Sequence, residues 1–152
     1  GFAWQPDVKL KDKDAKEIEL DIIAMCDGYL IVVECKNTLL LTSEGRKKEA
    51  IDELKAQLQR GIEAAIILGA RLFLLATLER EIPTEIKEFI QAQDEKYQEI
   101  HIRLLIRSEL IEGRFQERSI NDNYQLMQNI LGRYDFLPYY FDENCYSEDE
   151  IV

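Results

Sequence analysis

Polar and apolar residues alternate over the first third of the chain with the period of β-strands. Three strands are expected here, at residues 2–10, 17–25 and 29–36. Between the second and third strands, Asp27-Gly28 predicts a two-residue hairpin turn, because Gly tolerates the positive φ that such turns require. The beginning of the chain therefore predicts an antiparallel meander.

The hydrophobic period changes at Ser43. Apolar residues recur at helical spacing from there to Gly69, which predicts an amphipathic helix that ends at this glycine. The short run RLFLLATL, at 71–78, is apolar on both sides and predicts a central buried strand. A second helix is expected from Pro83 to about Tyr97, and a further strand at 100–106.

Together these elements predict an α/β fold with a mixed central sheet. The sheet would consist of the antiparallel meander, a crossover helix and buried strands, flanked by helices. The pattern weakens after residue 112, so we divide the chain into a core at 1–112 and a C-terminal helix with an acidic tail at 113–152.

The chain carries a net charge of −11, which opposes non-specific attraction to nucleic acid. Part of this charge lies in residues 134–152, which hold six acidic residues and no Lys or Arg. The tail is therefore a candidate contact for a protein partner.

Cysteine usage and hydropathy favour a cytoplasmic protein. The three cysteines, Cys26, Cys35 and Cys145, are odd in number and widely spaced, which is typical of reduced thiols. The sequence contains no apolar stretch of the ~20 residues needed to cross a bilayer. We therefore expect no membrane association.

The hairpin places charges where strands are otherwise Ile, Leu and Val. With a two-residue turn, Asp21 lies directly opposite Glu34, and Glu19 lies opposite Lys36. Like charges at facing positions destabilise a sheet, and a divalent cation such as Mg²⁺ between the carboxylates would remove that penalty. Lys36, on the same face, could orient or deprotonate an attacking water. The alternative is an ordinary charged outer face, with Glu19 and Lys36 as a surface ion pair.

The pattern D-x12-E-x-K, formed by Asp21 and Glu34-Cys35-Lys36, resembles the PD-(D/E)XK nuclease superfamily, also called restriction-endonuclease-like. The resemblance covers residues 2–112, more in element order than in residue identity. Within the superfamily, ELD at 19–21, ECK at 34–36 and LGARLFLLAT at 68–77 are similar to nuclease domains of CRISPR ancillary effectors, which act in antiviral defence.

The resemblance implies a nuclease that hydrolyses phosphodiester bonds of DNA or RNA with Mg²⁺ or Mn²⁺. Asp21, Glu34 and the Cys35 carbonyl would hold the metal, and Lys36 would be the catalytic lysine. Gln57 would be an accessory polar residue, and the alternative for Gln57 is an ordinary solvated helix position. Nucleases of this type often pair subunits, so a homodimer is a candidate arrangement.

The chain departs from the superfamily pattern in two places. Leu20 precedes the acidic residue where Pro is common, and no initial helix with an acidic side chain is evident. The alternative function is therefore a catalytically silent interaction or regulatory module with a nuclease-like fold.

Overall fold

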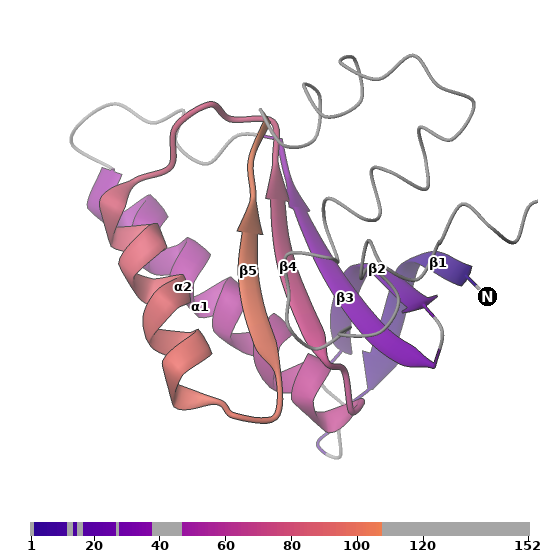
Figure 1. Cartoon of the computed structure of the whole chain (residues 1–152). Helices are drawn as coiled ribbons and strands as arrows, with labels where there is room; N and C mark the ends of the chain where they lie inside the picture. Colours follow the sequence, from indigo (N-terminus) through magenta and orange to yellow (C-terminus); the bar gives the residue numbers. More distant parts are fainter. Residues whose placement is uncertain (1, 12–13, 15–16, 27, 38–46, 108–152) are drawn as a thin grey trace, which may run out of the picture. The chain divides into compact units, whose positions relative to one another are not determined.

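A computed structural model describes residues 2–11, 14, 17–26, 28–37 and 47–107. Contacts between residues divide the chain into one unit at Gly1–Arg107 and another at Ser108–Val152. Figure 1 shows the described elements of the first unit, which is a mixed α/β structure with a five-stranded sheet in the order β1-β2-β3-β4-β5. The helix and acidic tail predicted at 113–152 lie outside the described residues.

The first three strands form the predicted antiparallel meander. They are β1 (Phe2–Lys11), β2 (Glu17–Cys26) and β3 (Tyr29–Lys36). Cys26 pairs with Tyr29, and Gly28 has a φ of 88°, so the two-residue turn and its register are confirmed. The β2–β3 pairing continues to Ile22 and Val33.

A helical crossover joins β3 to the next strand. Helix α1 (Lys47–Ile67) leads into β4 (Leu72–Thr77), which pairs with β3 in parallel. The predicted helix end is confirmed: Gly69 has a φ of 75°, and Ala70 N–H donates to the Ala65 carbonyl at 2.9 Å, which closes the last turn. The expected start at Ser43 lies outside the described residues.

A second helix and strand complete the sheet. Helix α2 (Thr84–Lys96) begins after Pro83, and β5 (His101–Leu105) pairs in parallel with β4. Asp94 of α2 accepts a hydrogen bond from Ile102 N–H at 2.8 Å and forms an ion pair with Arg103. This side chain therefore fixes the end of α2 to the start of β5.

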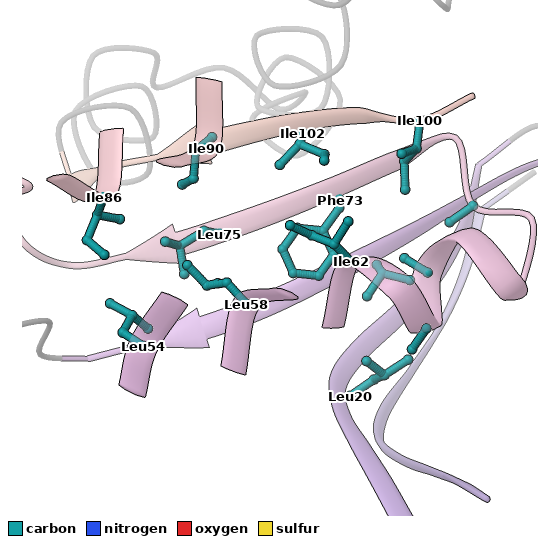
Figure 2. Packing of buried hydrophobic residues seen from close by; sticks show 14 of the residues in the cluster. Leu20, Leu54, Leu58, Ile62, Phe73, Leu75, Ile86, Ile90, Ile100 and Ile102 are labelled. Carbon is teal, nitrogen blue, oxygen red and sulfur yellow. The ribbon is translucent and has the colours of Figure 1, made fainter. Parts of the chain in front are cut away.

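Helices α1 and α2 cover the same face of the sheet, and the main core lies between them and the strands (Figures 1 and 2). Figure 2 shows Leu58 and Ile62 of α1 and Ile90 of α2 near Phe73 and Leu75 of β4. Helix α1 lies close to the sheet at Gly61, where an added Cβ would lie 3.1 Å from Cε2 of Phe73. Strand β4 is buried over nearly its whole length, as expected for a central strand.

Candidate functional site

Three polar side chains meet near the carboxyl end of β3. Glu34 Oε1 accepts a hydrogen bond from Gln57 Nε2 at 2.9 Å and lies 3.2 Å from Lys36 Nζ. Glu34 and Lys36 are two positions apart in a strand, so they share a face. Glu34 pairs across the sheet with Leu75, a core residue, and it therefore points toward the helices, where α1 presents Gln57.

Glu34 is a buried ionisable residue, with only 5% of its surface exposed. Burial is the main reason that its pKa is raised above the ordinary value, and the negative charge of Asp21 raises it further. The hydrogen bond and positive charge of Lys36 act in the opposite direction. Burial thus disfavours the charged form of the Glu34 carboxyl group, and Lys36 stabilises that form.

Asp21 reaches β3 through its side chain. Its Oδ2 accepts a hydrogen bond from Cys35 N–H at 2.7 Å, beyond Ile22 and Val33, where the main-chain pairing of β2 and β3 ends. Asp21 and Glu34 therefore do not form the predicted direct pair. The Asp21 carboxylate instead takes the place of a main-chain carbonyl of β2 as the acceptor for Cys35 N–H. The two acidic groups still interact, because the Asp21 charge contributes to the raised pKa of Glu34.

The strand alternation predicted for β2 is interrupted at Asp21. Leu20 is fully buried in the core, and Ile23, three positions later, packs against the same core cluster. A regular strand would place these two side chains on opposite faces. The regular alternation predicted for residues 17–25 is therefore wrong between Leu20 and Ile23, because the chain turns between them.

Lys36 and Glu19 do not form the surface pair that a regular hairpin predicts. Lys36 forms an ion pair with Glu34 instead, and its side chain is 24% exposed. Glu19 pairs with Lys9 in the β1–β2 register. The lysine is therefore held beside the buried carboxylate.

The main chain of Cys35 points toward Asp21. In an extended strand, the N–H and C=O of one residue are directed at the same neighbouring strand. Because Cys35 N–H donates to Asp21, its carbonyl is directed to the β2 side as well. The carbonyl proposed as a metal ligand therefore lies on the side where the Asp21 carboxylate approaches.

The Asp21 and Glu34 carboxylates and the Cys35 carbonyl are oxygen donors, which hard divalent cations prefer. Within the described residues, no group of three or more His, Cys, Asp and Glu side chains could hold a metal. The site instead offers two carboxylates and a carbonyl, a set that suits Mg²⁺ or Mn²⁺ with several bound waters. In the described part of the chain, the hydrogen bonds and ion pair of Asp21 and Glu34 engage Oδ2 and Oε1, which leaves Oδ1 and Oε2 for a cation.

Sequence reasoning did not single out Thr77, which ends β4 beside this site. Thr77 pairs with Lys36 in the β3–β4 register, is 2% exposed, and accepts a hydrogen bond from Glu79 N–H at 3.2 Å. The available signal was a hydroxyl residue at the carboxyl end of an apolar strand, where parallel sheets often carry functional groups.

No family model matches the sequence. A search of curated proteins also found no match. Among solved structures, the chain is similar to one titled "Crystal Structure of Protein of Unknown Function AF1548", with 17% sequence identity and a TM-score of 0.46. The match covers 86% of this chain and 58% of that protein, and a likeness at this level carries no argument about function. Across the described residues, no helix is long and apolar enough to cross a membrane.

Proposed function

We propose that this protein is a metal-dependent nuclease that hydrolyses phosphodiester bonds of DNA or RNA. The observation that supports the proposal best is the buried Glu34 carboxylate, on whose Oε1 Lys36 and Gln57 converge while Asp21 raises its pKa. Burying charged groups costs free energy, and well-packed apolar residues at the same positions often stabilise a protein as much as a buried ion pair or more. Stability alone therefore does not explain a carboxylate at this position. Ionisable groups with a shifted pKa and specific charged partners are typical of functional sites.

Each residue has a defined role in the proposed reaction. Asp21, Glu34 and the Cys35 carbonyl would hold the metal, and the Gln57 amide keeps the Glu34 carboxylate in one orientation. The bound Mg²⁺ or Mn²⁺ would supply Lewis-acid polarisation of the phosphate. Lys36 would orient or deprotonate the attacking water and balance the charge that develops on the phosphate.

Cleavage assays with matched variants test the proposal. The purified protein is incubated with single- and double-stranded DNA and RNA in Mg²⁺ or Mn²⁺, alongside Asp21→Asn and Lys36→Met. We expect each substitution to lower the cleavage rate by about 10²-fold or more. Lys87→Met, which removes an exposed lysine of α2, is the control and should cleave at the wild-type rate. Absent cleavage by the wild type, or equal rates for all four proteins, would contradict the proposal.

Metal binding provides a second test that does not need a substrate. Titration with Mn²⁺, followed by calorimetry, should show binding to the wild type and weaker binding to Asp21→Asn and Glu34→Gln. Asp52→Asn removes an exposed carboxylate of α1 and should leave the affinity unchanged. Equal affinity in all variants would mean that the ion binds elsewhere.

A second candidate is a catalytically silent interaction module with a similar fold. The net charge of −11 favours this candidate, because a substrate rich in phosphates would be repelled unless the surface near the site is locally basic or metal-bound. A folded protein that neither cleaves any of the four nucleic acids nor binds Mn²⁺ at Asp21 would support it.

A further inference from the structure

The edge strand β1 contains an unusual backbone conformation at Asp7. Its φ is 51°, and within the described residues it is the only non-glycine residue with a positive φ. Side chains with a Cβ are disfavoured in this region, although Asp and Asn are tolerated better than most. The neighbouring structure must therefore hold Asp7 in place.

The conformation of Asp7 coincides with a gap in the pairing of β1 with β2. The two strands pair from Phe2 and Cys26 to Lys11 and Glu17 with the same offset throughout, and only the position of Asp7 and Asp21 is unpaired. No residue is inserted on either strand at this point. The interruption is thus a local turn of the backbone and leaves the register unchanged.

Pro6 explains why the gap affects hydrogen bonding at Asp21. Pro6 faces Ile22 and has no N–H, so this pair must be one of the pairs that do not exchange hydrogen bonds. Because the two kinds of pair alternate along an antiparallel ladder, the next position is where Asp7 and Asp21 would exchange two main-chain bonds. The left-handed backbone of Asp7 prevents that exchange.

The other side of β2 changes at the same residue. Asp21 directs its carboxylate across to Cys35 N–H, and the strand switches the face of its side chains between Leu20 and Ile23. A residue whose main chain exchanged both hydrogen bonds with β1 could not make this turn.

We infer that Pro6-Asp7 is a positioning element for the Asp21 carboxylate. The left-handed backbone at Asp7 keeps β1 from pairing with Asp21, which lets β2 turn and directs the carboxylate to the Cys35 amide, beside Glu34. The structural part of this inference stands on the geometry of β1, β2 and β3, and its catalytic meaning rests on the proposed function.

A series of substitutions at Asp7 tests the inference by backbone preference. Asp7→Gly and Asp7→Asn accept the left-handed conformation, Asp7→Ala resists it, and the β-branched Asp7→Val resists it most. Amide NMR of Cys35 is the measurement. Its proton should resonate downfield, as expected of an amide that donates a short hydrogen bond to a carboxylate, in the wild type and in the Gly and Asn variants. In Asp7→Val this downfield shift should be lost, and the amide should exchange with solvent about tenfold faster.

Two controls separate this effect from a general loss of structure. The Val32 amide, in the interior of β3, reports whether the sheet remains intact. Gln5→Val places the same side chain at an exposed position of β1 and should leave the Cys35 amide unchanged. If Asp7→Val does not fold, the milder Asp7→Ala must show the same change to a smaller degree.

The outcomes distinguish this inference from the proposed function. An unchanged Cys35 amide in Asp7→Val and Asp7→Ala would overturn the inference, even if the wild type cleaves nucleic acid. A loss of the hydrogen bond in Asp7→Asn and Asp7→Gly as well as Asp7→Val would also overturn it, because the carboxylate of Asp7 and not its backbone would then matter. If the NMR result is as expected but the wild type does not cleave, the positioning role stands and the nuclease proposal fails. If the wild type does cleave, the rates should follow the same order as the protection of the Cys35 amide from exchange, with kcat changing more than KM.

Discussion

Repulsion between Asp21 and Glu34 should be measurable as a coupling free energy in unfolding. We consider Asp21→Asn, Glu34→Gln and the double variant. Asn keeps an oxygen that can accept the hydrogen bond from Cys35 N–H but removes the charge that raises the pKa of Glu34. A double-mutant cycle cancels the effects that each substitution has by itself.

The expected size follows from the placement of the two groups. The Asp21 carboxylate binds the main chain of Cys35, next to Glu34, so the two charges are separated by about one strand spacing, roughly 5 Å. Two unit charges at this separation repel by roughly 3 kcal/mol in a medium of effective dielectric constant near 20. Asp21 is only half-buried, so solvent screening reduces this value to about 1–2 kcal/mol. We therefore expect Asp21→Asn to be more favourable by this amount when Glu34 is present than in the Glu34→Gln background.

The pH dependence has a definite sign. The pKa of Glu34 is raised above 4.5 in the folded state, so the folded protein binds more protons than the unfolded chain between these two pKa values. The free energy of unfolding must then fall as pH rises through this window. Asp21→Asn should lower the pKa of Glu34, so the pH range in which the folded protein binds more protons becomes narrower. The free energy of unfolding should then fall less as pH rises.

Urea unfolding of the four proteins at pH 7 and low ionic strength measures the coupling. The same cycle at about pH 3, where carboxyl groups are largely protonated, should give a much smaller value. Saturating Mg²⁺ should stabilise the wild type more than Asp21→Asn, because a bound cation offsets the repulsion. A coupling of zero within error at pH 7, or one of attractive sign, would refute the reasoning.

Three other substitutions test the fold around the site. Gly61→Val should lower the free energy of unfolding, measured in urea, by about 1–3 kcal/mol, because the new side chain meets the buried ring of Phe73. Adding Phe73→Leu to this variant should partly restore the stability. An unchanged free energy of unfolding in Gly61→Val would mean that α1 can shift away from the ring without cost. Gly69→Ala should cost about 1 kcal/mol in thermal unfolding, since Gly69 has a φ of 75° with open space around it and only backbone strain changes; unchanged stability would contradict a strained helix end. Asp94→Ala should cost about 1.5–3 kcal/mol in urea unfolding, while the exposed Glu88→Ala costs less than 0.5 kcal/mol; equal effects would mean that Asp94 does not hold α2 to β5.

Local sequence signals were sufficient for the elements and for the hairpin register. The turn at Gly28 and the helix end at Gly69 depend on a backbone conformation that glycine adopts easily. The buried strand β4 was recognisable from its short apolar run after a helix. Each of these features involves residues that are close in sequence, so composition and period predict them.

The meeting of the site residues depended partly on local and partly on long-range structure. Glu34 and Lys36 share a face because they are two positions apart in one strand. Gln57 was predicted from the family resemblance, but its hydrogen bond to Glu34 spans 23 residues. The bond forms because the packing of α1 on the sheet places Gln57 next to Glu34. No periodic pattern fixes the rotation of a helix over a sheet to that accuracy.

The sequence by itself determined that two acidic residues and a lysine would lie at one end of a hairpin, because a two-residue turn leaves only one register. Only the tertiary structure decided how Asp21 is used. Its main chain leaves the ladder opposite the left-handed Asp7, and its carboxylate takes the place of a main-chain acceptor for Cys35. Strand periodicity assumes a regular ladder, and the packing of Leu20 and Ile23 on one core favours breaking it at Asp21.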